Sequence, residues 1–306
     1  MGIKDCFGED GGGGGGAPAT WAYNPAETYI VVHGDGASKT HLNAGNLYFY
    51  NTTLDSWNKG ADTAAQQSNR DMGYSLCIAC NGKVYSYAGF YQAVKHNEYD
   101  PNTDTWTART DLSMGFWKSQ NACLDGATGF YIHDSAGTLK HYETTTDVVT
   151  TLAAGSAVNG SLMRIGAKLF YFETAVGNAY NEYDIATNTW TMGAGTYPFG
   201  YFYYPASGSD GTTGYIMASG LTAASFYSFD GTTFTALASG SGSARNAACP
   251  SKLNVINGKV YSGHKNPWGG ASRYSTHWQI YDIATNTWSD SVSEAPLSLV
   301  EGGTAL

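Results

Sequence analysis

Two cysteines spaced as Cys77-x-x-Cys80 are the first residues whose types and spacing suggest chemistry. A C-x-x-C pair serves as a redox couple, or as half of a zinc site, when it lies on a turn. Here it falls in a predicted strand, where residues three apart point to opposite faces. The remaining cysteines, Cys6, Cys123 and Cys249, provide neither a second pair nor an even count for a disulfide framework. We therefore expect buried free thiols.

Three histidines, His33, His133 and His264, each fall near the end of a predicted strand and could reach one common rim. His41 and Asp35 lie close in sequence to the first of them. Metal sites usually show ligands at characteristic spacing, and the chain has neither H-x-H nor a histidine pair three to five residues apart. We interpret these residues as unrelated loop histidines, and we predict no metal site and no cofactor.

Aromatic and arginine side chains gather in segments predicted to connect strands. Exposed aromatics with arginine are enriched at binding hot spots, and aromatic planes also stack on the apolar faces of sugar rings. In a chain with 23 tyrosines, the same side chains can instead pack the loops themselves, so both interpretations stay open. The predicted binding face consists of Arg70, Phe90, Tyr91, Phe116, Trp117, Tyr197, Arg245, Trp268, Arg273 and Tyr274, with Lys118 and Phe199 in the same segments.

The composition of this 306-residue chain indicates an all-β protein with many turns. Charged residues make up only 13%, well below the roughly one quarter that is average for globular domains. Glycine (39 residues) and tyrosine (23 residues) are abundant instead. Glycine suits tight turns, and tyrosine favours strands.

The net charge of −9 and the lack of a Lys/Arg cluster exclude nucleic acid as an expected partner. No apolar stretch approaches the roughly 18 residues that span a bilayer, so we expect no membrane insertion. The first ten residues, MGIKDCFGED, lack the apolar core of a signal peptide. We expect a cytoplasmic chain, or one released by another route such as assembly into a virus particle.

The strongest pattern is an internal repeat that begins with tyrosine, continues with Asp, Asn, Thr or Pro, and ends with tryptophan. Its six starting positions lie 41 to 52 residues apart, which is the period of propeller blades. Asx and Thr side chains can bond to the amides of a short turn, so each copy predicts a hairpin. Clear copies run from Tyr50 to Trp57, Tyr99 to Trp106, Tyr183 to Trp190 and Tyr281 to Trp288, and degenerate copies start at Tyr142 and Phe229.

Two further strands are predicted before each hairpin. Residues 75–80 and 83–88 flank Asn81-Gly82, a favoured hairpin dipeptide, and residues 253–256 and 259–263 flank Asn257-Gly258 in the same way. Together with the hairpin this makes four strands per repeat, which is a propeller blade. The sequence therefore predicts an all-β, six-bladed β-propeller of four-stranded antiparallel blades.

A Gly-Lys-Val-Tyr turn followed by a Tyr-Asp-x-x-Thr-x-x-Trp hairpin resembles the Kelch repeat. That family often has an arginine about a dozen residues before the inner hairpin, and Arg70 and Arg245 match this position. The resemblance covers roughly residues 20–292 and implies a Kelch-type propeller. The paired glycines that usually end the second strand are replaced by Ala88-Gly89 and Gly263-His264, so no specific Kelch subfamily follows.

The chain is predicted to have three parts. Residues 1–19 contain six consecutive glycines and form a flexible tail, because glycine loses much conformational freedom on ordering. The alternative is an anchor through which residues 1–16 bind an assembly partner. Residues 20–300 form the propeller, and residues 301–306 form a C-terminal tail. Either residues 295–300 or residues 20–24 are expected to supply the strand that closes the ring.

Three functional hypotheses follow. The leading one is a non-catalytic binding or structural module that presents its loop face to a protein or glycan, as a phage tail or capsid-surface component. The second is an intracellular Kelch adaptor. The third is a carbohydrate-active enzyme, similar to a sialic acid mutarotase or to galactose oxidase, although no catalytic residue and no copper ligand set can be placed by motif.

Overall fold

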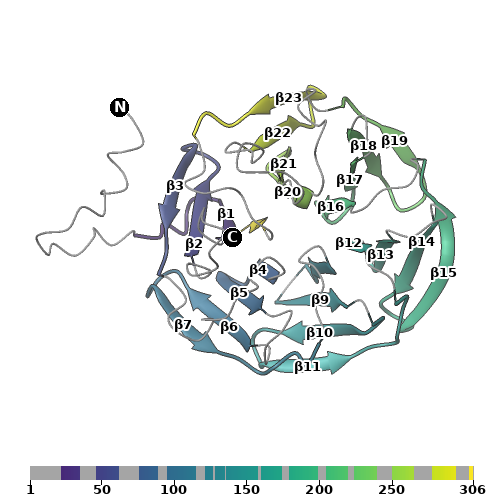
Figure 1. Ribbon diagram of the computed structural model, residues 1–306, viewed down its shortest axis with the longest axis horizontal. Helices are drawn as coiled ribbons and strands as arrows, with labels where there is room; N and C mark the ends of the chain where they lie inside the picture. Colours follow the sequence, from purple (N-terminus) through teal and green to yellow (C-terminus); the bar gives the residue numbers. More distant parts are fainter. Residues whose placement is uncertain are drawn as a thin grey trace, which may run out of the picture.

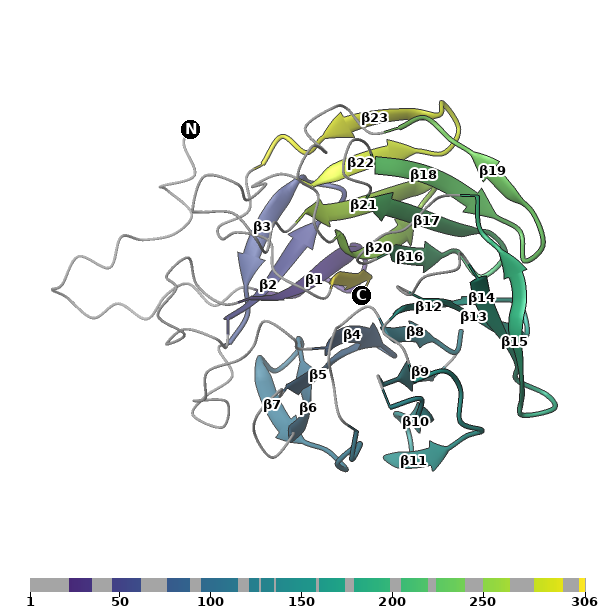
Figure 2. The ribbon, with the colours of Figure 1, turned by 45° about the vertical axis from the view of Figure 1, so that its right-hand side comes forward.

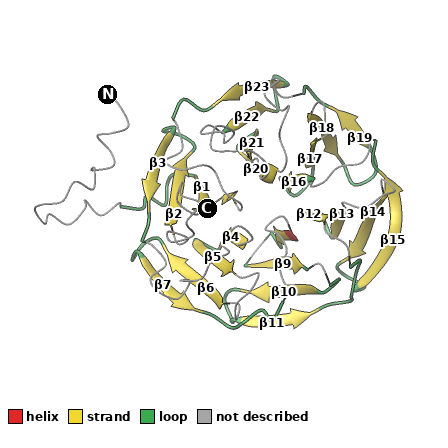
Figure 3. Ribbon diagram, viewed as in Figure 1, coloured by secondary structure: helices red, strands yellow, loops and turns green. Residues whose placement is uncertain are grey.

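The computed structural model describes residues 22–34, 46–61, 76–88, 95–114, 121–126, 128–134, 136–157, 160–173, 179–198, 205–219, 224–239, 250–264, 278–293 and 303–305. In these ranges 24 strands assemble into six four-stranded antiparallel sheets. The sheets surround a common centre as the blades of a ring (Figure 1). Strands and short turns make up nearly all of the described chain (Figure 3). The predicted all-β, six-bladed β-propeller is confirmed.

The four strands of each blade follow one another from the centre of the ring outward. Blade 1 consists of β24 (Gly303–Ala305), β1 (Tyr29–Gly34), β2 (Asn46–Asn51) and β3 (Ser56–Lys59). Blade 2 consists of β4 (Leu76–Cys80), β5 (Lys83–Ala88), β6 (Lys95–Asp100) and β7 (Thr105–Ala108). Blade 3 consists of β8 (Ala122–Leu124), β9 (Gly129–His133), β10 (Leu139–Glu143) and β11 (Val148–Thr151).

Blades 4 to 6 complete the ring. Blade 4 consists of β12 (Gly160–Ile165), β13 (Lys168–Glu173), β14 (Ala179–Asp184) and β15 (Thr189–Thr196). Blade 5 consists of β16 (Ala206–Ser209), β17 (Gly214–Ser219), β18 (Ala224–Phe229) and β19 (Phe234–Ala236). Blade 6 consists of β20 (Pro250–Ile256), β21 (Lys259–His264), β22 (Gln279–Asp282) and β23 (Thr287–Asp290).

The connections between strands alternate between two edges of the ring, because neighbouring strands are antiparallel. At the hairpin edge, short turns join the first strand of a blade to the second and the third to the fourth. Asn81 and Gly82 alone link β4 to β5, with φ of 53° and 70° that suit a two-residue hairpin. At the loop edge, opposite, the second strand leads to the third and each blade leads to the next.

The core of the molecule consists of six apolar clusters, and each cluster lies between two neighbouring blades. Tyr29 and Phe49 of blade 1, for example, pack with Val84 and Tyr99 of blade 2. Equivalent clusters fill the seams between blades 2 and 3, 3 and 4, 4 and 5, 5 and 6, and 6 and 1. The ring is therefore closed by the same side-chain packing that joins consecutive blades.

The predicted repeat is confirmed as the hairpin between the third and fourth strands of each blade. Tyr99 lies directly opposite Trp106 in the β6–β7 ladder. The same register pairs the starting residue of the other copies with its counterpart: Tyr50 with Trp57, Tyr142 with Val149, Tyr183 with Trp190, Phe229 with Phe234 and Tyr281 with Trp288.

An Asp or Asn five residues after each repeat tyrosine ties neighbouring blades together. In blade 2, Asp104 accepts a hydrogen bond from the Tyr99 hydroxyl and another from the backbone N–H of Ala61, 2.7 Å away at the exit of blade 1. Trp106 Nε1 donates to the Ala61 carbonyl at 3.0 Å. We call the tyrosine hydroxyl, the Asp or Asn and the preceding blade's amide the clasp.

Five of the six seams carry a clasp. The acceptor residues have φ between 47° and 56°, the left-handed region that Asn and Asp tolerate best after glycine. The seam between blades 4 and 5 has no clasp, because Phe229 in place of tyrosine has no hydroxyl to donate. The acceptors are Asp55, Asp104, Asp147, Asn188 and Asn286, and their backbone donors are Val292, Ala61, Thr110, Ala153 and Ala238.

The chain closes its ring with the strand nearest to the C-terminus. β24 pairs antiparallel with β1, placing Val31 opposite Thr304, and forms the innermost strand of blade 1. Figure 2 shows β24 beside β1 near the centre of the ring. Asp55 completes the closure by accepting the Val292 amide of blade 6 at 2.7 Å.

This closure corrects the predicted domain boundary. Residues 303–305 belong to the propeller instead of a C-terminal tail, because β1 would otherwise have an unpaired inner edge. Residues 22–24 are not in a strand, and residues 295–300 and the predicted tail 1–19 lie outside the described residues. No helix among the described residues is long and apolar enough to cross a membrane.

Candidate functional site

The binding face predicted from the sequence belongs to the loop edge, and most of it lies outside the described residues. Tyr197 is described, and it is only 4% exposed. Its hydroxyl donates to the Glu173 carbonyl at 2.8 Å, and its ring packs in the cluster between blades 4 and 5. Tyr197 therefore seals a seam instead of facing a ligand, because burying so large a ring with its hydroxyl satisfied is favourable. Outside the described residues are Arg70, Phe90, Tyr91, Phe116, Trp117, Arg245, Trp268, Arg273 and Tyr274, together with Lys118 and Phe199.

The predicted histidines do fall near the ends of second strands, in β1, β9 and β21. The His133 side chain is fully buried, and its ring centroid lies 4.1 Å from that of Tyr171. Neither ring nitrogen has a hydrogen-bond partner in the described part of the chain. Burial lowers the pKa of His133 to about 4, so the ring is neutral and serves as a core residue. The side chains of His33 and His264, and all of Asp35 and His41, lie outside the described residues.

The C-x-x-C cysteines are buried free thiols on opposite faces of β4, as predicted. Cys77 packs between blades 1 and 2, whereas Cys80 packs between blades 2 and 3. Burial raises the pKa of the Cys80 thiol to about 12, and it does the same for Cys123. Because only the thiolate is a good nucleophile or metal ligand, burial disfavours redox and metal chemistry at Cys80 and Cys123.

A cavity of about 260 Å³ lies where the inner strands of blades 3 to 6 converge, and we call it the channel pocket. Its wall comes from β8, β12, β16 and β20 and from the turns that follow β8 and β16. Those turns place the pocket near the hairpin edge, opposite the predicted binding face. Leu124, Leu162 and Val255 contribute apolar surface, while Arg164 and Lys252 contribute charge.

Some of the polar groups of the channel pocket are hydrogen-bond donors without a partner in the described part of the chain, whereas Ser207 and Ser209 are hydrogen-bonded to blade 4. Lys252 is only 8% exposed, and burial lowers its pKa. In the described part of the chain, neither Lys252 nor Arg164 forms an ion pair. Arg164 Nε and Asn254 Nδ2 are also buried without a hydrogen-bond partner there. Since buried donors without acceptors are costly, this wall is suited to a ligand that brings acceptors.

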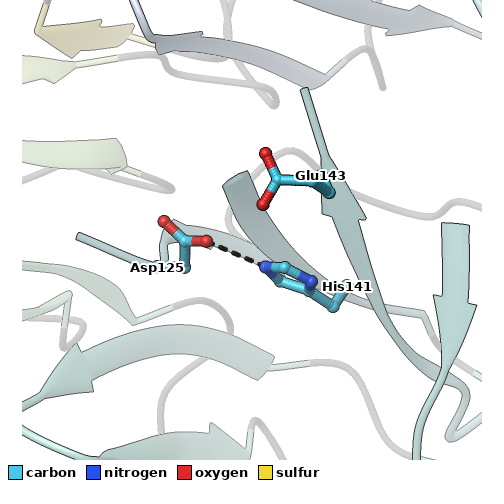
Figure 4. Close-up of side chains that lie close together, drawn as sticks. All are labelled: Asp125, His141 and Glu143. Carbon is cyan, nitrogen blue, oxygen red and sulfur yellow. Dashed lines mark hydrogen bonds and ion pairs between the residues drawn. The ribbon is translucent and has the colours of Figure 1, made fainter. Parts of the chain in front are cut away.

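A second group of polar residues lies beside this pocket on blade 3. His141 Nε2 and Asp125 Oδ2 are 2.9 Å apart, and a Glu143 oxygen completes a set of atoms that all lie within 4.8 Å of one another (Figure 4). Gly129 leaves room for this pair, because a Cβ there would come within 2.7 Å of both atoms. The group could hold a divalent cation only if the His141–Asp125 hydrogen bond were given up. Glu143 also accepts a hydrogen bond from Thr145.

Neither the channel pocket nor the Asp125 group is among the residues predicted from the sequence. His141 and Glu143 lie two residues apart on β10, so the H-x-E spacing is the signal that could have indicated their shared face. The approach of Asp125 was not, because it depends on the strand order of blade 3. The channel pocket joins residues more than 120 positions apart, from Cys123 to Lys252, and it requires the closed ring.

Comparisons with known proteins identify the fold. No protein-family model matches the chain, and no curated protein does. The propeller in a crystal structure of a nidogen/laminin complex has a TM-score of 0.62 at 10% identity, covering 91% of this chain and 98% of that one. TolB from Acinetobacter baumannii has a TM-score of 0.60 at 10% identity, covering 91% of this chain and 66% of that one. At this identity the likeness concerns architecture alone: the chain is a six-bladed β-propeller, and the Kelch resemblance stays a prediction.

Proposed function

We propose that this chain is a non-catalytic, protein-binding β-propeller whose partner docks on the loop edge. The observation that carries the proposal is the unequal distribution of chain between the two edges. Short turns occupy the hairpin edge, such as the two residues between Cys80 and Lys83. The loop edge receives the long connections, from Lys59 to Leu76, from Ala236 to Pro250 and from His264 to Gln279. Long loops on a rigid scaffold are where recognition residues concentrate.

The scaffold is rigid enough to hold such loops in place. Six apolar clusters and five clasps join the blades, and β24 closes the ring. The predicted aromatic and arginine residues, Arg70, Arg245 and Trp268 among them, fall in the loop-edge connections. A solved propeller of the same architecture comes from a nidogen/laminin complex, which is a precedent for a propeller in a protein complex.

We also propose that the chain works as part of a virus particle. The low charge content and the glycine-rich head support a virus-particle component, held through residues 1–16 and presenting the loop edge to a protein or glycan. Sedimentation of the native protein tests this setting. We expect it to move with particles, and a chain lacking residues 1–16 to move as a free protein. Native protein that sediments at the size of a free 32.5 kDa chain would overturn the virion assignment.

The lysines allow the binding face to be tested by amine-reactive cross-linking and mass spectrometry of the native protein. Lys39, Lys118 and Lys265 lie in loop-edge connections, whereas Lys83, Lys168 and Lys259 begin strands at the hairpin edge. We expect links to another protein from the first three lysines only. A cross-linker attached at one end only shows that a lysine is reactive, and this signal from all six lysines serves as the internal control.

Variants make the same test independent of lysine chemistry. Replacing Arg70, Arg245 and Trp268 by alanine should abolish the partner links. The matched control replaces Leu54, 63% exposed in the hairpin-edge turn between β2 and β3, and Met192, 55% exposed on the outer strand β15, and should leave the links intact. Partner links that come from the hairpin-edge lysines, or that survive the triple replacement, would refute the proposed face.

A further inference from the structure

The channel pocket contains two basic side chains, the buried Lys252 and the partly exposed Arg164, and neither forms an ion pair among the described residues. Lys252 and Arg164 come from β20 and β12, on different blades. Both line the pocket together with Cys123. Burial raises the pKa of the Cys123 thiol to about 12, the charges of Lys252 and Arg164 oppose this rise, and that of Asp125 adds to it. The thiol is therefore uncharged near neutral pH and is no counter-ion for either cation.

The carboxylate on the pocket wall is already committed elsewhere. Asp210 Oδ1 accepts hydrogen bonds from the backbone N–H of Thr212 at 2.8 Å and of Thr213 at 2.7 Å. Burial opposes ionisation of Asp210, but these hydrogen bonds outweigh it and lower the pKa. Asp210 is thus held within its own turn. The neighbouring Asp125 is committed as well, to His141 Nε2 at 2.9 Å and to the Gly129 N–H at 3.0 Å.

A buried cation without a counter-ion is unfavourable, and a bound anion would relieve that cost. Arginine and lysine together match the two oxygens of a carboxylate, and Asn254 adds an unpaired amide donor. Leu124, Leu162 and Val255 offer apolar surface to the rest of the molecule. At about 260 Å³ the cavity is slightly below the range typical of drug-sized ligands, so the occupant is small.

We propose that the channel pocket binds a small organic carboxylate, whose charged end meets Lys252 and Arg164 and whose apolar end lies against the leucine and valine side chains. The site lies at the hairpin edge and is separate from the partner face on the loop edge. A ligand at this site would join four blades at the centre of the ring, so binding also stabilises the folded ring.

The test uses the full chain and measures binding by calorimetry and by the shift in melting temperature. The probes are acetate, butyrate and benzoate, their uncharged amides, and inorganic phosphate. We expect binding that strengthens from acetate to benzoate, a rise in melting temperature with benzoate, and no response to benzamide. Phosphate binding without any carboxylate binding would overturn the choice of a carboxylate.

Two variants locate the binding site. Lys252→Met and Arg164→Met keep the apolar stem and remove the charge, and each should weaken benzoate binding about tenfold or more. Lys168→Met is the matched control, because Lys168 is partly exposed and pairs with Glu182 at 2.6 Å. If Lys252→Met does not fold, Arg164→Met alone decides. Benzoate binding of equal strength in wild type and in a folded pocket variant, or no carboxylate binding at all, would refute the site.

Discussion

The buried polar residues of the ring differ in how completely their hydrogen bonds are met. Tyr85 donates to Glu98 at 2.9 Å inside the seam between blades 2 and 3. His96 uses one ring nitrogen, 2.9 Å from the Thr110 carbonyl, and leaves the other without a partner in the described chain. His133 uses neither. A buried imidazole without partners already carries the cost of an unsatisfied N–H, and protonation would add the larger cost of a charge in the core.

His133 is therefore expected to make the protein less stable in acid. Its pKa is about 4 in the folded chain against about 6.5 when unfolded. Protons then bind more tightly to the unfolded chain, so the stability present above pH 6.5 falls as the pH drops towards 4. By pH 4.5 the loss should reach roughly 2 to 3 kcal/mol.

His133→Phe isolates this contribution, because phenylalanine keeps a ring beside Tyr171 and cannot titrate. Urea unfolding at pH 7.5 and pH 4.5 gives the free energy of both proteins. We expect the variant to gain on the wild type as the pH falls. A stability difference that is the same at both pH values would show that His133 is not the titrating group.

The hairpin between the third and fourth strands is the element that most of the fold depends on. In blade 2 its tyrosine and tryptophan rings pack together, and Asp100 accepts a hydrogen bond from the Asn102 N–H within the turn. Its Asp104 hydrogen-bonds to the neighbouring blade. Burial and then the hydrogen bond to Asp104 raise the pKa of Tyr99. The hydroxyl consequently stays protonated and can always donate.

Asp104 offers a direct test of the clasp. Asp104→Ala removes the acceptor for Tyr99 and Ala61 and places alanine at φ 54°. We expect a loss of about 2 kcal/mol or more in the free energy of unfolding. Asp104→Asn is the control, because Asn188 and Asn286 fill the same role in blades 4 and 6, and it should stay within about 0.5 kcal/mol of the wild type. Equal effects of the two replacements on the urea midpoint would show that the clasp adds nothing.

The hairpins were predictable because they are local in sequence. Tyr99, Asn102 and Trp106 belong to one eight-residue segment whose turn chemistry is visible in the residue types. The reach of Asp104 to Ala61 was not predictable, because it joins segments 43 residues apart and depends on how two blades meet. The prediction for Tyr197 was wrong for a related reason. Its position after β15 suggested an exposed loop, but its hydroxyl donates to the Glu173 carbonyl and its ring packs in the seam between blades 4 and 5.

At the scale of the whole molecule, the number of blades followed from the repeat period, whereas the closing strand did not. Gly303–Ala305 is too short and too small in its side chains to be recognised as a strand. It is one because β1 presents an unpaired edge to it. The channel pocket belongs to this scale as well, since Arg164 and Lys252 are brought together only when the ring is complete.

Removal of residues 301–306 should therefore weaken the ring as a whole. It takes β24 from β1 and from the neighbouring inner strands of blades 2 and 6. We expect a clear fall in melting temperature by calorimetry. The closed ring should unfold in a single cooperative transition, and every seam contributes to its stability. The matched deletion of residues 1–16, predicted to lie outside the propeller, should leave the melting temperature unchanged. Equal melting of the full chain and the chain without residues 301–306 would rule out a closing role for β24.

The stability of the seam between blades 4 and 5 should depend on temperature differently from that of the other seams. Its inner strands are hydrogen-bonded to each other, as between the Ser161 and Ser207 hydroxyls at 2.6 Å. Its outer part lacks the clasp and has a group of rings instead, with Phe229 stacked on Phe234 at 4.3 Å and edge-on to Phe170 at 5.0 Å. The driving force for burying such rings fades on cooling, whereas hydrogen bonds depend much less on temperature. Chilling should thus weaken the outer part of this seam first, so the outer strands of blades 4 and 5 would separate in the cold before those of blades 6 and 1, while the inner strands β12 and β16 stay joined by their hydrogen bonds.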